Sequence, residues 1–274
     1  TMVSVIDDLE RLKFAKRVTV LRKGKCIKTV DTAKFNSDDL AKLMVDSNAF
    51  IPTAVPQGLS CASLFRLENV CTKATAKHKA LSNINLEVCA GEVVGVAGIS
   101  GSGQAELGML IAGLLELSSG IIFGAANERS RSLKDLACYV PGEQKLAYAP
   151  GLSVAANSFI RSVNRPGAHT LGFVKSSLMR QQAQQIIESF VITPSLCDVA
   201  ANALSGGNLQ RLIIGRELST SAKIVVADNP CAGLDAAMSM RIRHELRQAA
   251  SAGRGVVLIS PDLEELIATC DRIV

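Results

Sequence analysis

The sequence predicts an α/β domain with a mostly parallel sheet, preceded by a smaller segment. From residue 64 onward, short apolar runs alternate with helical patterns, which is typical of parallel strands with helices packed on them. Several of these runs are continuously apolar, as buried central strands require. The chain has 274 residues, of which 48% are hydrophobic. It is therefore long enough for one large domain with a substantial core, plus a smaller piece.

The N-terminal segment has a pattern of its own. Strand-like runs at 18–21 and 26–30 flank a basic turn, so they predict a hairpin. A short helix is expected over 36–45. Residues 48–63 are rich in Pro, Gly and small polar residues and are expected to form a linker. The main domain is then expected over 64–274.

The main domain alternates between the two kinds of element. Strands are expected over 64–70, 81–89, 92–97, 138–140, 224–227 and 256–259. Helices are expected over 104–115, 178–190, 208–218, 236–249 and 263–268. A faint repeat relates residues 10–18 to 265–273, because both read as a helix end, a basic residue and a strand start. This repeat predicts that the chain begins late in one copy of a domain and ends at the same point of the next copy.

Composition argues against several classes of protein. The net charge of +5 is mild, Trp is absent and aromatic residues make up 4%, so binding to nucleic acid is not expected. The acidic start does not resemble a signal peptide, and the longest apolar stretch, 107–117, is too short to span a bilayer. None of the eight cysteines forms a C-x-x-C pair. Reduced thiols in a cytosolic protein are therefore expected.

A glycine-rich loop follows the strand expected at 92–97. The sequence GISGSGQA lies between that strand and a helix, the context in which backbone N–H groups and a helix dipole bind phosphate. A complete phosphate loop ends in Lys and then Ser or Thr, whereas this one has Gln104 and Ala105. The loop therefore lacks a cation for phosphate and a hydroxyl for Mg²⁺. Its candidate nucleotide-binding residues are Gly98, Ser100, Gly101, Ser102, Gly103, Gln104 and Ala105.

A second motif, LSGGNLQR, opens the helix expected at 208–218. Ser205 and the N–H groups of Gly206 and Gly207 would form an anion-binding helix start. Ser-Gly-Gly followed by Gln-Arg rarely arises as an ordinary helix cap. This motif is therefore a stronger indication of nucleotide binding than the glycine loop.

The third motif, IVVADNPCAGLD, spans 224–235. A buried strand that ends in Asp228 would place a carboxylate at the sheet edge, where ligands bind. There it could hold Mg²⁺ through water. Asn229 follows, at the position where a general-base Glu would be expected, and an amide accepts no proton from water at neutral pH. Asp235 would lie in a turn available to a partner domain.

In their order and spacing, these motifs resemble those of ABC-type ATPases over residues 64–274. The resemblance implies a P-loop ABC cassette with a mostly parallel sheet core, an antiparallel β edge and a helical subdomain at about 150–205. Residues 1–47 resemble the C-terminal tail of a preceding cassette. The closest likeness is to the duplicated ATPase subunit of bacterial sugar and nucleoside importers. Asn208 after the Ser-Gly-Gly motif and the segment 139–157, similar to the coupling loop of that group, favour it.

The match departs from the family pattern at several functional positions. The coupling-loop position is occupied by Gly142, and Pro261 stands where the family has its switch His. No aromatic residue for stacking on adenine occurs near 72–80, where His78 is a poor substitute. With Asn229 at the base position, no catalytic residue is expected in this half.

The resemblance also implies head-to-tail pairing, in which each ATP lies between the glycine loop of one cassette and the Ser-Gly-Gly helix of the other. The expected cofactors are ATP and Mg²⁺. The expected partners are a preceding or second cassette, two transmembrane permease subunits and, indirectly, an extracellular substrate-binding protein. The expected location is peripheral, on the cytoplasmic face of the plasma membrane. Two alternatives remain open: a non-hydrolysing regulatory or interaction module, and a truncated remnant.

Overall fold

The structure is a computed structural model. It describes residues 16–22, 25–31, 62–98, 101–125, 128–130, 132–134, 136–170 and 172–274. The chain divides into two compact units, one of residues 1–55 with 233–245 and the other of residues 56–232 with 246–274.

The first unit contains the hairpin that the sequence predicts. Strand β1 (Arg17–Arg22) pairs antiparallel with β2 (Lys25–Asp31), with an irregularity in register between Val20 and Leu21. Across the pair, the hydroxyls of Thr19 and Thr29 lie 3.0 Å apart and share a hydrogen bond. The helix expected over 36–45 and nearly all of the linker lie outside the described residues.

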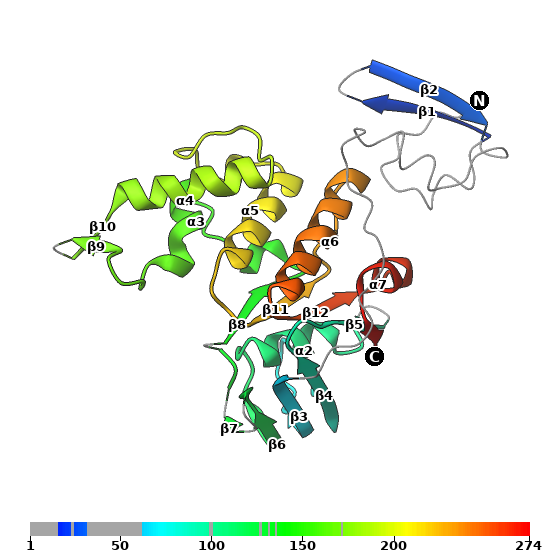
Figure 1. Cartoon of the computed structure of the whole chain (residues 1–274), viewed down its shortest axis with the longest axis vertical. Coiled ribbons are helices and arrows are strands. Elements are labelled where there is room, and N and C mark those ends of the chain that lie inside the picture. Colours follow the sequence, from blue (N-terminus) through cyan, green and yellow to red (C-terminus); the bar gives the residue numbers. More distant parts are fainter. Residues whose placement is uncertain are drawn as a thin grey trace. The chain divides into compact units, whose positions relative to one another are not determined.

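A five-stranded parallel sheet forms the centre of the second unit (Figure 1). Its strand order is β13-β5-β12-β11-β8. The strands are β5 (Val93–Ala97), β8 (Ala137–Val140), β11 (Ile224–Asp228), β12 (Gly255–Ser260) and β13 (Arg272–Ile273). All six residues of β12 are buried, and so are the first four of β11. Their continuous apolar runs therefore correspond to strands covered on both faces.

An antiparallel sheet of order β4-β3-β6-β7 packs against this centre. Its strands are β3 (Ser63–Thr72), β4 (Ile84–Cys89), β6 (Leu117–Phe123) and β7 (Arg129–Ser130). Helix α2 (Gln104–Ile111) lies between the two sheets (Figure 1). Leu110 and Ile111 of α2 join Phe65 of β3 and Val226 of β11 in one buried cluster. This core fixes the start of α2, and with it the glycine loop, against the sheet.

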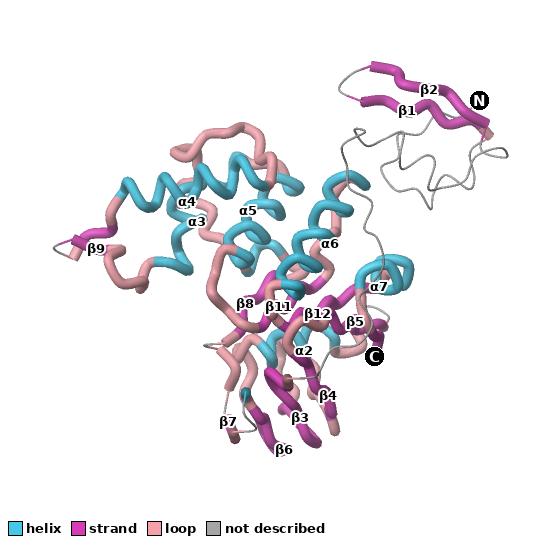
Figure 2. Tube along the Cα trace, in the orientation of Figure 1, coloured by secondary structure: helices cyan, strands magenta, loops and turns pink. Residues whose placement is uncertain are grey.

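A mostly helical region separates β8 from β11 (Figure 2). It contains α3 (Val154–Phe159), α4 (Ser176–Ser189) and α5 (Gly206–Leu218). It also contains the short pair β9 (His169–Thr170) and β10 (Phe173–Val174) and three 3₁₀ turns, η4 (Gln144–Leu146), η5 (Ile160–Ser162) and η6 (Ala201–Ala203). Helices α6 (Ala236–Ser251) and α7 (Leu263–Thr269) follow in the chain. No helix of the described residues is both long enough and apolar enough to cross a membrane.

Within the described residues, the expected strands and helices are found, with shifted ends. The strand expected from residue 81 begins at Ile84, because Leu81 closes a loop by donating its N–H to Thr72 Oγ1. The helix expected to reach 115 ends at Ile111, before Gly113 at a φ of 72°. The expectation of reduced thiols is wrong at Cys89, which forms a disulfide bond. The six other cysteines that the structure describes form no disulfide bond.

Candidate functional site

The glycine loop joins β5 to α2, as the sequence predicts. Gly101 and Gly103 have φ values of 85° and 108°, a left-handed conformation that residues with a Cβ rarely adopt. Gly103 caps α2 without any side-chain cap, so the start of the helix consists of backbone alone. Ser100 lies outside the described residues. The backbone N–H groups of the first turn of α2 follow Gly103 directly, and such a helix start favours anions.

Gln104 turns back into this loop. Its Oε1 accepts a hydrogen bond from the N–H of Ser102 at 3.1 Å. Its Nε2 lies so close to Gly98 that a Cβ at that position would collide with it. A loop N–H that would face phosphate is therefore used by the protein's own side chain. The sequence predicts the missing cation at Gln104, but only the structure reveals this inward contact.

Lys79, from the loop between β3 and β4, contacts the glycine loop from outside. Its Nζ donates to the carbonyl of Gly101 at 2.5 Å. Its backbone N–H donates to Glu106 Oε1 in the first turn of α2 at 3.0 Å. No sequence motif singles out Lys79. The sequence offers one signal. Lys79 is a basic residue just before the strand expected over 81–89, and the next strand leads into the glycine loop.

Asp228 ends β11 and lies at the C-terminal edge of the parallel sheet, as predicted. The hydroxyl of Tyr139, from β8, donates to its Oδ2 at 3.4 Å. Burial raises the pKa of the Asp228 carboxyl above its usual value, whereas the N–H of Gly142 and the Tyr139 hydroxyl act in the opposite direction. A Cβ on Gly142 would lie only 3.2 Å from Oδ2. The small residue at the coupling-loop position thus lets the chain pass close to the carboxylate.

Asn229 and Pro261 stand at the two positions where the resemblance places catalytic side chains. Asn229 has a φ of 45°, a left-handed conformation that Asn tolerates better than most residues. Its N–H donates to the carbonyl of Ile259 at 2.7 Å, so its backbone is tied to β12. Pro261 follows β12 and has no N–H to donate. Neither side chain can act as a general base or as a proton-carrying switch.

The Ser-Gly-Gly motif begins α5, with Ser205 as its N-cap. Ser205 Oγ accepts from the backbone N–H of Asn208 at 3.4 Å and from its Nδ2 at 2.9 Å. Ser205 and Gly206 are exposed. The first N–H groups of α5 and the Ser205 hydroxyl therefore lie at an exposed helix start, the kind of surface that favours anions.

The polar residues after the motif anchor this helix. Gln210 is 1% exposed and donates from Nε2 to the carbonyl of Pro230 at 3.1 Å. Arg211 donates to the carbonyl of Val191 at 2.9 Å. The Gln210 bond links α5 directly to the segment that follows Asp228. The start of α5 and the edge of the sheet are thus held in one framework.

Asp235, the last residue of the third motif, belongs to the other unit. Its Oδ1 accepts the N–H of Met238 at 2.8 Å, so it stabilises the first turn of α6. This local contact gives Asp235 a structural role as a helix cap. Its suggested contact with a partner stays a prediction.

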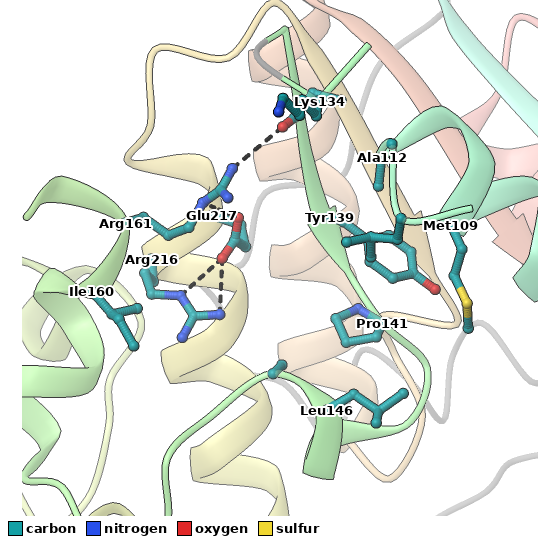
Figure 3. Close-up of a pocket in the computed structure, with 14 residues that line it drawn as sticks. Met109, Ala112, Lys134, Tyr139, Pro141, Leu146, Ile160, Arg161, Arg216 and Glu217 are labelled. Carbon is teal, nitrogen blue, oxygen red and sulfur yellow. Dashed lines mark hydrogen bonds and ion pairs between the residues drawn. The ribbon is translucent and has the colours of Figure 1, made fainter. Parts of the chain in front are cut away.

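A groove of about 480 Å³ opens beside β8 (Figure 3). Apolar side chains of α2, β8 and η5 line it, among them Met109, Tyr139 and Ile160. At one side, Glu217 is 2% exposed and carries two ion pairs, to Arg161 at 3.3 Å and to Arg216 at 2.8 Å. A charge this deeply buried needs such partners. The groove therefore combines apolar lining residues with a group of paired charges at one side.

The donors at the loop fit ATP and Mg²⁺ only in part. The N–H groups suit phosphate, but the hydrogen bond between Gln104 Oε1 and the N–H of Ser102 must break before the loop can surround a phosphate group. Asp228 offers a carboxylate, Ala105 offers no hydroxyl, and no cluster of three metal-binding side chains occurs among the residues described. A Mg²⁺ ion that arrives with phosphate groups needs only one or two protein carboxylates. Asp228 is the residue of this chain that would hold such an ion.

Comparisons with known proteins give the family. The profile of the ABC transporter family matches residues 81–232. The chain is 34% identical to the glucose import ATP-binding protein TsgD13 of Haloferax volcanii, over 100% of the chain and 51% of that protein. It is 31% identical to the nucleoside import ATP-binding protein NupA of Lactococcus lactis, over 100% of the chain and 55% of that protein. The chain thus spans about half the length of these curated relatives.

The fold has close counterparts among solved structures. A bacterial ABC transporter cassette, MJ0796, solved as a dimer, superposes with a TM-score of 0.63 at 23% identity, over 77% of this chain and 93% of that one. The same cassette bound to ADP and phosphate gives a TM-score of 0.64, with the same identity and coverage. The predicted fold class is confirmed: the chain belongs to the ABC transporter family and has the fold of its ATP-binding cassettes.

Proposed function

We propose that this chain is part of the ATP-binding subunit of an importer for sugars or nucleosides. In this proposal it is the second cassette of a duplicated subunit, preceded by the tail of the first. It contributes its Ser-Gly-Gly helix to a composite ATP site whose phosphate loop comes from the partner cassette. Its own loop takes part in a second site that binds nucleotide weakly and does not hydrolyse it.

The observation that carries this proposal is the contrast between the two motifs. At the start of α5, Ser205 and Gly206 are exposed and Gln210 anchors the helix, so an incoming phosphate meets a preformed surface. At the glycine loop, Gln104 already uses the N–H of Ser102. Asn229 and Pro261 supply no proton-transfer group. One motif is therefore ready for a ligand and the other is incomplete.

The proposed cofactors are ATP and Mg²⁺. Asp235 is proposed to face the partner cassette, as it would in the head-to-tail arrangement. Asp228 is proposed to hold Mg²⁺ at this chain's own loop, with the ion carried there by the nucleotide phosphates. The relatives named as import ATP-binding proteins support nucleotide binding coupled to import.

The other proposed partners are two membrane permease subunits and, through them, an external substrate-binding protein. The groove beside β8 is the proposed docking place for a cytoplasmic segment of a permease. It is lined by Tyr139 and Leu146 from the segment that resembles a coupling loop, and Leu146 is 65% exposed. The chain would then sit peripherally on the cytoplasmic face of the plasma membrane.

A second candidate function is a non-hydrolysing module that only completes a partner's site. The inward contact of Gln104 favours this second function, because the contact occupies one of the N–H groups in the chain's own loop that would face phosphate. The two functions differ in their effect on transport. An importer half changes the rate of uptake, whereas a regulatory module changes only the partner's nucleotide affinity.

A substitution in the Ser-Gly-Gly motif tests the main proposal. In a protein that joins this chain to an intact preceding cassette, Ser205→Ala removes the hydroxyl at the helix start. We expect the ATPase rate to fall at least about tenfold, as when one preorganised donor to a transition state is lost. Steady-state phosphate release measures the rate.

The matched control is Ser219→Ala at the other end of the same helix, where Ser219 Oγ donates to the carbonyl of Gly215. It removes a hydroxyl from α5 without touching the proposed nucleotide surface. An unchanged ATPase rate for Ser205→Ala, or an equal loss for both variants, would contradict the proposed composite site.

A further inference from the structure

The glycine loop lacks its usual cation, yet a lysine lies against it. Gln104 occupies the position of the phosphate-binding Lys and carries no charge. Lys79, which approaches from a different element, places Nζ on the carbonyl of Gly101. A Cβ on Gly101 would lie 3.6 Å from this ammonium group. A positive charge thus sits directly at the loop that has lost its own.

The loop that carries Lys79 is closed at its base and fixed at its tip. Thr72 and Leu81 exchange two hydrogen bonds, one from each backbone N–H. At the tip, Thr75 Oγ1 accepts the N–H groups of Lys77 and His78, at 3.3 and 3.0 Å. Hydrogen bonds therefore hold the backbone on both sides of Lys79.

A third contact ties Lys79 to the helix that begins at the glycine loop. Its N–H donates to Glu106 Oε1, two residues beyond Gln104. The backbone of Lys79 is therefore fixed relative to the start of α2. Its side chain is exposed and reaches the glycine loop through its ammonium group. This is the arrangement expected of a cation that moves a short way to meet an incoming anion.

We propose that Lys79 supplies the phosphate-binding charge that Gln104 lacks, so that a nucleotide phosphate replaces the carbonyl of Gly101 as the partner of Nζ. The exchange is favourable, because a bond between two charged groups is stronger than one to a neutral carbonyl. The inference rests on the proposed weak nucleotide binding at this loop. It does not depend on the role of the Ser-Gly-Gly helix.

The test compares the binding of a nucleotide, ATP, with the binding of its nucleoside, adenosine, which has no phosphate. The 274-residue chain is titrated with ATP and with adenosine. Dissociation constants are measured by ligand-observed NMR, which detects weak binding. We expect Lys79→Ala to weaken ATP binding about tenfold, the scale of one hydrogen bond to a charged group. Adenosine binding is expected to stay unchanged, and Lys79→Arg is expected to keep most of the ATP affinity.

Lys77→Ala is the matched control, because it removes the same charge from the same loop. If it weakens ATP binding as much as Lys79→Ala, the effect comes from general charge and the inference fails. The inference also fails if adenosine binding falls with ATP binding, or if the unaltered chain binds no ATP at all. This last result would leave the composite-site proposal untouched, because the Ser205→Ala experiment tests it on a different surface.

Discussion

Single residues decide which of the two nucleotide-binding motifs is ready for a ligand. The sequence predicts that Gln104 removes a cation, since residue type alone shows this. It does not predict that the amide turns inward to bind Ser102 N–H, because a side-chain rotamer depends on the space that Gly98 leaves. Nor does it predict the contact of Lys79, which joins residues 22 positions apart in the chain.

The inward contact of Gln104 leads to an expectation that charge alone would not give. Gln104→Ala removes a neutral group and should strengthen ATP binding about two- to fivefold, because the Ser102 N–H is released for phosphate and a typical net hydrogen bond is worth about 1 kcal/mol. Gln104→Lys should strengthen it further, since it also adds a charge. The same NMR titration measures both variants.

Gln181→Ala serves as the control, since Gln181 is an exposed residue of α4 and lies outside the glycine loop. If Gln104→Ala instead weakens ATP binding, the amide must be a ligand of the nucleotide. In that case its contact with Ser102 would be part of the bound state and would not compete with phosphate.

At the scale of elements, the apolar runs are the most reliable guide. The strands at 224–228 and 255–260 could be predicted because continuous burial demands continuous hydrophobicity. Strand β6 (Leu117–Phe123) was not expected, because its first half reads LSSG and three of its residues are exposed. Its pairing with β3 is a long-range effect that local patterns do not reveal.

The packing of α4 on α5 determines how firmly the Ser-Gly-Gly helix is held. A Cβ on Gly215 of α5 would lie 2.7 Å from Ile186 Cγ2 and 2.8 Å from Phe190 Cδ2. Gly215→Ala should therefore destabilise the fold by about 1–3 kcal/mol through overpacking. For a domain of this size that lowers the melting temperature by roughly 2–4 °C per kcal/mol. Calorimetry measures the change.

Gly151→Ala is the matched control, because an added Cβ there meets nothing within 4 Å. It should leave the melting temperature nearly unchanged. Equal melting temperatures for the two variants would mean that α4 and α5 separate easily and that α5 is held mainly by the Gln210 bond to Pro230.

At the scale of the whole molecule, two different ATP sites are proposed, one that hydrolyses ATP and one that does not. This difference requires several departures from the family's residue pattern at once. The loop lacks a cation and a hydroxyl, the position after Asp228 lacks a base, and the end of β12 lacks a switch His. These departures are predictions from the sequence, since each is a matter of residue type. The backbone conformation of Asn229 is not predicted from sequence. Its φ of 45° is a conformation in which a Glu would be strained. The departure at this position is thus matched by the local geometry.

The role of Asn229 can be separated from the role of the glycine loop by introducing the family's residues first in the loop and then at position 229. With Gln104→Lys and Ala105→Ser together, we expect tighter ATP binding but hydrolysis still at background, because no base activates water. Adding Asn229→Glu should then raise the rate of phosphate release by about 10²-fold or more, while the left-handed backbone lowers stability by about 1–2 kcal/mol. The rise should also depend on protein concentration, since in head-to-tail pairing the loop of one chain needs Ser205 of another. Fast hydrolysis by the unaltered chain, or an increase with the loop changes alone, would show that the base lies elsewhere and that the incomplete half is active after all.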